Sequence, residues 1–284
     1  MCELFAVSSK KCVKINDYLK EFYNHCEQHP HGWGLAIMQG NQSIIQKQPL
    51  KANQSNELKE ILSQEIFVEH AFAHIRLATI GYTDSFNCHP FSGIDNAGRT
   101  WTLIHNGTIF KYEKLNKYVT KQIGETDSER ILLYIIDEIN NLQDELERSL
   151  SSEEIIQLLN ETITNLAEGN KLNLMIFNGE NLFIHSNYKN SLYYIEKDDT
   201  LFISTKPLTK EGWKQFPINT LKVIKDGKVV FSGKKHEYEY FVTEEQFKFI
   251  LDNVSPELKQ KIINNFGDLS YAKEYQLNKQ GDYS

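Results

Sequence analysis

Two helical patterns in the middle of the chain separate two groups of strand patterns, and this order constrains the fold most. The first helix is predicted to begin at Thr126, with Glu129 three residues later, and the second at Ser151, with Glu154 three residues later. This spacing is typical of a capping box. Apolar residues recur at helical spacing after both starts, so we expect two amphipathic helices that pack side by side.

The segments on either side of these helices have the apolar patterns of strands. Before the helices, strands are predicted at residues 3–9, 66–75 and 101–105, with a hairpin that turns near Gly40 and a loop at residues 79–97. After them, three hairpins are predicted, with turns at Asn178-Gly179, Asp198-Asp199 and Asp226-Gly227. Hairpins join antiparallel strands. The sequence therefore predicts an α+β fold of antiparallel sheet covered by helices.

Composition narrows the class of protein. A chain of 284 residues with 40% hydrophobic content can bury a large core, whereas a net charge of −7 with scattered lysines disfavours nucleic acid binding. No apolar run reaches the roughly 20 residues of a membrane span, and no signal sequence is evident, so we expect a cytoplasmic protein without a membrane partner. Four cysteines without a C-x-x-C pair predict free thiols and no cysteine zinc site.

Cys2 is the first candidate functional residue. If Met1 is removed, the mature chain begins with a thiol and a free amine on the same residue. A thiolate is a strong nucleophile, but an ordinary cysteine is only slightly ionised at neutral pH and needs a proton acceptor nearby. A terminal amine, with a pKa of about 7.7 to 8.0, can take that proton and return it to a leaving amine. Taken alone, a cysteine at this position is more often an unremarkable residue at a chain terminus, so Cys2 has to be judged together with the other motifs.

Three further positions carry unusual residues at predicted strand or helix ends. Arg76 ends an apolar strand, and its fork of donors suits a carboxylate. Asn106 and Gly107 follow another apolar strand and together offer a side-chain amide and a backbone N–H for an oxyanion hole. Asp127 lies in the first helical turn, where it suits an ammonium group. Each also has an ordinary explanation: a surface arginine, a tight turn, and an acid that complements the helix dipole.

Five motifs together resemble one family. They are Cys2, the H-x-R-x-A-T-x-G run at 74–81, Asn87-Cys88-His89-Pro90-Phe91, His105-Asn106-Gly107 and Glu125-Thr126-Asp127-Ser128. Their order and approximate spacing are similar to those of the class II glutamine amidotransferase domain. The Met1-Cys2-Glu3-Leu4 opening and Ser204-Thr205-Lys206-Pro207 resemble the stand-alone members of the YafJ type. This resemblance implies an N-terminal nucleophile hydrolase fold, a four-layer αββα sandwich of two antiparallel sheets.

The resemblance implies a catalytic role for three residues. Cys2 is expected to attack the γ-carbonyl carbon of glutamine with the help of its own amine. Asn106 and the N–H of Gly107 are expected to bind the oxyanion, an interaction worth about 3 to 4 kcal/mol per donor. Ammonia or an amine leaves, and water then hydrolyses the γ-glutamyl thioester. The resemblance implies no cofactor and no metal.

The same resemblance implies which residues bind the charged groups of the substrate. Arg76 is expected to bind the α-carboxylate and Asp127 the α-ammonium, with backbone near Thr79 and Ile80 assisting. One departure concerns the segment His31-Gly32-Trp33-Gly34, because the stand-alone members have Asp-Gly-Trp-Gly there. The histidine puts the detail of the amino-acid pocket in question.

The domain organisation follows from where the motifs end. We expect a glutamine amidotransferase domain at residues 2–234 and a C-terminal helical extension with a polar tail at 235–284. The extension is too short for a synthase domain that consumes ammonia. A separate partner protein accepts the ammonia, or the protein is simply a hydrolase.

Three other functions fit parts of the sequence. A γ-glutamyl peptide hydrolase of the glutathione-degradation type would use the same residues, because only the leaving amine differs. A non-catalytic module could bind γ-glutamyl compounds, although binding alone requires neither Cys2 nor Asn106. A metal site would need three or four converging ligands among six scattered histidines. These histidines are His29, His31, His70, His74, His89 and His105.

Overall fold

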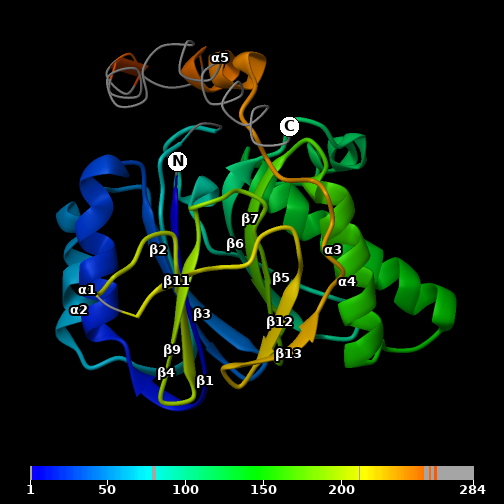
Figure 1. Cartoon of the computed structure of the whole chain (residues 1–284), viewed down its shortest axis with the longest axis horizontal. Helices are drawn as coiled ribbons and strands as arrows, with labels where there is room; N and C mark the ends of the chain where they lie inside the picture. Colours follow the sequence, from blue (N-terminus) through cyan, green and yellow to red (C-terminus); the bar gives the residue numbers. More distant parts are fainter. Residues whose placement is uncertain (1, 79–80, 211, 253–255, 257–258, 261–284) are drawn as a thin grey trace, which may run out of the picture.

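The chain forms two stacked antiparallel sheets with helices on both outer faces (Figure 1). The structure is a computed structural model that describes residues 2–78, 81–210, 212–252, 256 and 259–260. The four layers, helix, sheet, sheet and helix, confirm the predicted αββα sandwich of the α+β class. All strand pairs are antiparallel, as hairpin connections require.

The first sheet has seven strands in the order β11-β9-β10-β1-β4-β2-β3. Its strands are β1 (Glu3–Lys14), β2 (Trp33–Gln39), β3 (Gln42–Gln48), β4 (Phe67–Ile75), β9 (Tyr193–Lys197), β10 (Thr200–Ser204) and β11 (Lys214–Gln215). The start of the chain therefore lies in the middle of this sheet, between β10 and β4. A central strand is hydrogen-bonded on both edges, which fixes the backbone that follows Cys2.

The second sheet has six strands in the order β13-β12-β8-β7-β6-β5. Its strands are β5 (Phe91–Ile94), β6 (Thr100–Thr108), β7 (Lys171–Phe177), β8 (Leu182–His185), β12 (Lys222–Lys225) and β13 (Lys228–Ser232). The hairpins β7-β8, β9-β10 and β12-β13 confirm the three predicted from their turns. Residues 171–177 of β7 are buried on both faces, because one face meets the other sheet and the opposite face meets helices.

Helices cover each sheet from outside. The helices α1 (Asn16–Asn24) and α2 (Asn56–Ser63) pack on the first sheet, whereas α3 (Asp127–Leu146) and α4 (Ser152–Ala167) pack on the second (Figure 1). A last helix, α5 (Glu244–Asp252), lies beyond the sandwich at the end where β1 begins. Short 3₁₀ turns are His25–Gln28, Ala52–Gln54, Ser85–Asn87 and Glu113–Tyr118.

Alternate residues of each strand enter the space between the sheets. Leu4 and Ala6 of β1 pack there with Ile104 of β6 and Met175 of β7. The intervening residues of the same strands belong to the cores beneath the helices. This period of two also determines which polar side chains face each other at the ends of the strands.

Three local predictions were wrong. The strand predicted at 101–105 continues to Thr108, so Asn106 and Gly107 lie inside β6 and not in a tight turn. The predicted loop at 79–97 contains β5. Thr126 caps α3, but the Glu129 carboxylate accepts bonds from the backbone N–H groups of residues 123 and 124 and not from the cap, so only Ser151 forms the predicted capping box.

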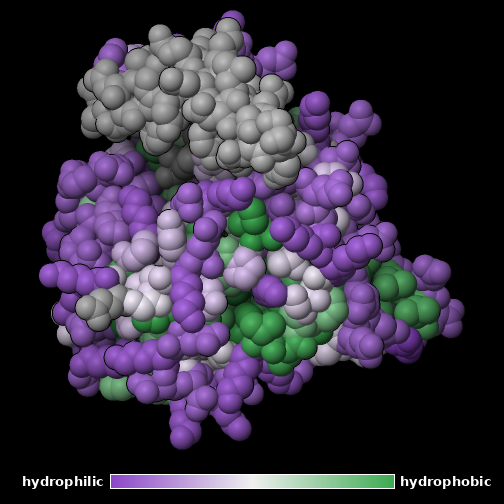
Figure 2. All heavy atoms as spheres, viewed as in Figure 1, coloured by the Kyte–Doolittle hydropathy of each residue, from purple (hydrophilic) through white to green (hydrophobic). Residues whose placement is uncertain are grey.

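The visible surface of the molecule is mostly hydrophilic. In Figure 2, hydrophobic side chains gather in a small area over the β12-β13 hairpin, where Val229 and Val230 are half exposed. Among the helices that the structure describes, none combines the length and apolar character needed to cross a bilayer.

Packing between the sheets makes a testable contribution to stability. Ile104 is fully buried there, and its truncation in Ile104→Ala leaves a cavity between the two sheets. We expect the free energy of unfolding to fall by about 2–5 kcal/mol. Ile94→Ala in the neighbouring strand is the control, because Ile94 is 65% exposed. Urea unfolding of both variants checks this, and equal losses would contradict it.

Candidate active site

Strand alternation brings Cys2 and Asn106 to the same end of the space between the sheets. Cys2 precedes β1 and shares the side of Leu4, which packs between the sheets. Asn106 shares the side of Ile104 in β6 and is buried. Because β1 begins and β6 ends at this edge of the sandwich, the thiol and the amide project inward from opposing sheets.

Backbone and side-chain hydrogen bonds hold the start of the chain in place. Thr205 Oγ1 accepts a bond from the Leu4 N–H at 2.8 Å, and the Thr205 N–H donates to the Leu4 carbonyl at 3.0 Å. The Cys2 Sγ donates to the Leu77 carbonyl at 3.6 Å, just beyond the end of β4. These contacts place the thiol next to the segment that follows β4.

Glu3 anchors the same strand from the other face of the sheet. Its buried carboxylate accepts a bond from His25 Nδ1 at 2.7 Å and lies 2.6 Å from Lys206 Nζ and 3.7 Å from His29 Nε2. Burial acts to raise the pKa of Glu3, but the bond with His25 and the charges of His29 and Lys206 outweigh it, so the pKa lies below its usual value. The cluster ties β1 to residues 25–29 and to the loop after β10.

Arg76 is buried at the end of β4, with only 2% of its surface exposed. Its N–H donates to the Gly32 carbonyl at 2.8 Å, and its own carbonyl accepts from the His31 N–H at 3.1 Å. The guanidinium donates to the carbonyl of Tyr82 at 3.0 Å and to that of Gly81 at 3.2 Å. These bonds give the guanidinium a fixed direction beside the loop at 81–82.

His31 is the residue at which the segment 31–34 departs from the Asp-Gly-Trp-Gly pattern, and its ring makes a hydrogen bond to the backbone that follows β4. Its Nδ1 accepts the Ala78 N–H at 2.9 Å, so the neutral ring carries its proton on Nε2. Burial and the charge of Arg76 lower the pKa of His31, which keeps this acceptor available at neutral pH. A carboxylate oxygen is also an acceptor, so an aspartate at this position can satisfy the same N–H.

Two of the predicted motifs meet through Asn87 and Glu125. The Asn87 Oδ1 accepts the Glu125 N–H at 2.7 Å, and its Nδ2 donates to the Glu125 carboxylate at 3.2 Å. The same carboxylate accepts the Tyr82 N–H at 2.9 Å. Since Tyr82 also accepts from Arg76, the arginine loop and the segment before α3 form one connected unit.

Asp127 is buried at the first turn of α3, at the same edge of the sandwich. Its Oδ2 accepts the Ile109 N–H at 2.8 Å, one residue beyond β6, and its Oδ1 accepts a long bond of 3.4 Å from Ser128. The Ser128 hydroxyl also lies 2.9 Å from His105 Nδ1. An ionised carboxylate can accept about four bonds, so Asp127 retains acceptor capacity for an ammonium group.

Gly107 is required by the close approach of β7. A Cβ at this position would lie 1.9 Å from the Lys171 carbonyl oxygen and 2.3 Å from His105 Nε2. Only glycine permits this contact. The residue therefore allows β6 and β7 to pair as far as the site, independently of any role for its N–H.

Two polar residues of β7 at this edge were not among the predicted site residues. Asn173 lies opposite Asn106 in the β6-β7 register, and Lys171 lies opposite Thr108. Asn173 is held by bonds with Ser191 and Ser186, both at 2.8 Å. The sequence held a signal, because a lysine and an asparagine alternate with leucines in a strand of otherwise apolar residues.

Four of the six histidines that suggested a metal site are buried: His29, His74, His89 and His105. His74 stacks on His89 with ring centroids 4.1 Å apart, and burial lowers the pKa of both well below the usual value. His70 lies against Phe177 at 4.6 Å. Within the described part of the chain, no three histidine, cysteine or acidic side chains gather as a metal site would require. All four cysteines are free thiols, as predicted.

Thr79 and Ile80 lie outside the described residues, so their expected backbone role stays a prediction.

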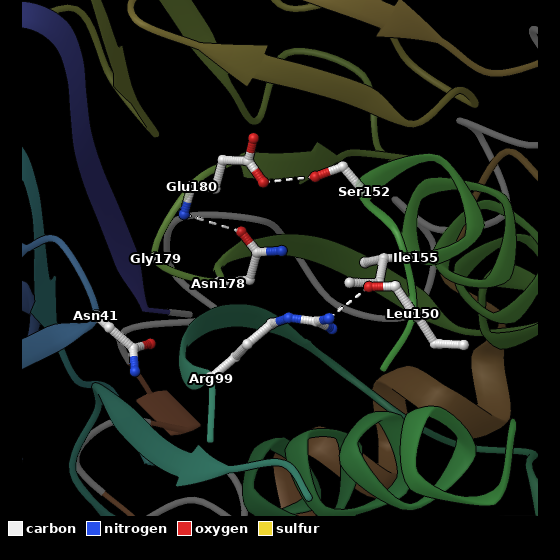
Figure 3. Close-up of a pocket in the computed structure, with 8 residues that line it drawn as sticks. All are labelled: Asn41, Arg99, Leu150, Ser152, Ile155, Asn178, Gly179 and Glu180. Atoms are coloured by element: carbon white, nitrogen blue, oxygen red, sulfur yellow. Dashed lines mark hydrogen bonds between the residues drawn. The ribbon is translucent and has the colours of Figure 1, made fainter. Parts of the chain in front are cut away.

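A surface hollow of about 310 Å³ (Figure 3) lies at the opposite edge of the sandwich, where β2 and β7 end and β6 begins. It contains none of the predicted site residues. Its lining residues are Asn41, Arg99, Leu150, Ser152, Ile155, Asn178, Gly179 and Glu180.

The fold and this edge of polar residues define an N-terminal nucleophile hydrolase architecture, and comparisons with known proteins agree. The structure resembles the B. subtilis glutamine phosphoribosylpyrophosphate amidotransferase with a TM-score of 0.57 at 15% identity, over 83% of this chain and 49% of that one. A predicted glutamine amidotransferase from Pseudomonas aeruginosa gives a TM-score of 0.55 at 19% identity, over 81% of this chain and 100% of that one. Both similarities concern the fold.

Sequence comparison identifies the family. A sequence profile described as glutamine amidotransferases class-II matches residues 1–200, so the chain belongs to the class II glutamine amidotransferases. It is also 27% identical over 262 residues to the uncharacterized protein MJ1515 of Methanocaldococcus jannaschii, over 83% of this chain and 72% of that protein. Membership indicates chemistry on the amide of glutamine, by hydrolysis or transfer.

The Glu3 cluster predicts a pH-dependent stability. Glu3→Gln keeps the shape of the side chain but leaves His25 and Lys206 without their anion, so we expect a loss of about 1.5–3 kcal/mol in unfolding free energy at pH 7. Because the folded pKa of Glu3 is lowered, its contribution is present above the unfolded pKa and is lost as the pH falls through the folded pKa.

Urea unfolding at pH 7 and at pH 3 measures this difference. The gap between wild type and Glu3→Gln should narrow at the lower pH. Glu65→Gln is the control, since Glu65 forms a solvent-exposed pair with Lys14. A gap that is the same at both pH values would show that the charge of Glu3 does not stabilise the fold.

Proposed function

We propose that the protein hydrolyses the γ-amide of glutamine or of a related γ-glutamyl compound, with Cys2 as an N-terminal nucleophile. The observation that supports this most is the convergence of Cys2 and Asn106 from opposing sheets, beside Arg76, in a chain of the class II family. The function requires removal of Met1, because the freed amine of Cys2 then serves as the base.

The reaction proceeds through two acyl transfers. The amine of Cys2 takes the thiol proton, and the sulfur attacks the γ-carbonyl carbon to form a tetrahedral oxyanion. The carbon–nitrogen bond breaks as the amine returns the proton to the leaving nitrogen, which leaves a γ-glutamyl thioester. Water then adds to the thioester carbon, the carbon–sulfur bond breaks, and glutamate is released.

The neighbouring residues bind the charges of this substrate. Asn106 Nδ2 and the Gly107 N–H stabilise the oxyanion. Arg76 binds the α-carboxylate and Asp127 the α-ammonium, assisted by backbone at Thr79 and Ile80. The two charged residues are buried at the same edge of the sandwich, which favours strong binding because water does not screen them there.

The acceptor of the released nitrogen is a further part of this proposal. We assign residues 2–234 to the amidotransferase domain and 235–284 to an extension. Ammonia or an amine is released into solution or to a separate partner protein, and water accepts the γ-glutamyl group. A panel of glutamine, γ-glutamyl amines and γ-glutamyl peptides, assayed for released glutamate, identifies the leaving group.

Replacement of the nucleophile tests the mechanism. Cys2→Ala should abolish glutamate release from every compound of the panel, because no other group at this position forms the thioester. Cys12→Ala should retain activity, since Cys12 is an exposed thiol further along β1. Intact mass reports whether Met1 is absent from both proteins. Normal turnover by a natively melting Cys2→Ala would refute the mechanism.

Replacement of Arg76 tests substrate binding. Arg76→Lys keeps the charge but loses the two-pronged geometry, so we expect KM to rise about 10- to 100-fold with a smaller change in kcat. Arg99→Lys is the matched control, because Arg99 lies in the hollow at the opposite edge (Figure 3). Steady-state kinetics distinguishes them. An unchanged KM in Arg76→Lys would show that Arg76 does not bind the substrate.

A further inference from the structure

Lys171 is a buried cation that the mechanism above does not use. It is the first residue of β7 and has only 3% of its surface exposed. Lysine is almost never fully buried, because removing an ammonium from water costs free energy. A lysine in this position therefore requires a compensating interaction in the folded protein.

The register of the strands directs Lys171 between the two sheets. Lys171, Asn173 and Met175 share one face of β7, and Met175 packs in the core between the sheets. Thr108, opposite Lys171, lies two residues beyond Asn106 on the same face of β6. The ammonium thus enters the edge of the sandwich that holds Cys2 and Asn106.

An aromatic side chain contacts the ammonium of Lys171. Its Nζ lies 4.8 Å from the centre of the Tyr188 ring, a cation–π contact. The Tyr188 and Tyr240 rings pack in a T-shaped arrangement with centroids 5.6 Å apart, and the Tyr240 N–H donates to the Asn187 carbonyl at 2.7 Å. The segment before α5 therefore helps to shield the lysine from water.

The electrostatic properties of Lys171 agree with this position. Burial lowers the pKa of Lys171 to about 7, and the charge of Cys2 opposes part of that decrease. A negative charge on Cys2 favours the charged form of the lysine, so the two opposite charges attract one another.

We propose that Lys171 is a positioning residue that acts through Cys2, with its ammonium facing the thiolate from the opposing sheet and stabilising it for attack. In the proposed mechanism Arg76 and Asp127, not Lys171, bind the α-carboxylate and the α-ammonium of the substrate. This proposal rests on the nucleophilic role of Cys2, but its test measures thiol reactivity and needs no substrate.

Other charged or titratable groups also surround this edge. Arg76, His31 and Cys88 lie around Cys2 on the side of the first sheet, and the charges of Cys2 and Cys88 interact. His105, on the outer face of β6, interacts with the charge of Lys171. Variants of Lys171 keep these four residues, and Lys171→Arg also keeps the charge that acts on His105, so a change in Cys2 reactivity seen in Lys171→Met but not in Lys171→Arg reports on the charge of the lysine.

The test is the rate of Cys2 alkylation by iodoacetamide between pH 5 and 10, with the modified peptide identified by mass spectrometry. In Lys171→Met, the midpoint of the profile of alkylation rate against pH should rise by about one pH unit. The alkylation rate at pH 7 should fall several-fold. Lys171→Arg should stay close to wild type because it keeps the charge. Lys47→Met is the matched control, as Lys47 is a partly buried lysine held by the carbonyls of Cys88 and Pro90.

Identical profiles for wild type and Lys171→Met would overturn the proposal, as would equal shifts in the Met and Arg variants. If Lys171→Met does not fold, the reciprocal measurement decides. Reductively ¹³C-methylated Lys171 in Cys2→Ala should titrate at a lower pH than in wild type, and an unchanged midpoint would overturn the proposal. A shifted alkylation profile in a protein that cleaves no γ-glutamyl compound would support the pair but reject the proposed function.

Discussion

The fixed position of the chain start is the constraint on which the rest of the site depends. Thr205 holds the backbone of Leu4, and the buried carboxylate of Glu3 binds His25 and Lys206 from two other segments. A chain terminus ordinarily frays, because few contacts offset its conformational entropy. Here the central strand of a sheet begins two residues after Met1, so the thiol of Cys2 has a defined direction.

The space between the sheets changes character along its length. In its middle, aliphatic side chains such as Ile104 and Met175 pack against one another. At one edge, the same alternation of strand residues presents Cys2, Asn106 and Lys171, of which Asn106 and Lys171 are buried. The site is therefore a continuation of the core in which polar residues replace apolar ones.

Local sequence patterns predicted which helices and hairpins form better than they predicted the residues at which the strands end. Hairpins with Asn-Gly and Asp-Gly turns and the capping box at Ser151 were confirmed because short-range backbone preferences decide them. Asn106-Gly107 has the same local preference for a turn, yet pairing with β7 keeps it in a strand. The role of His31 also required the structure, since its partner, the N–H of Ala78, is distant in sequence.

The sequence alone determined the layered antiparallel fold and the order of five motifs, because periodicity and turn chemistry are local properties. It also singled out Cys2, Arg76, Asn106 and Asp127 as candidates. Only the tertiary structure decided which side chains meet: the connection of Asn87 to Glu125, the cluster at Glu3 and the position of Lys171. The physical reason is strand register, which fixes facing residues through pairings between segments far apart in the chain.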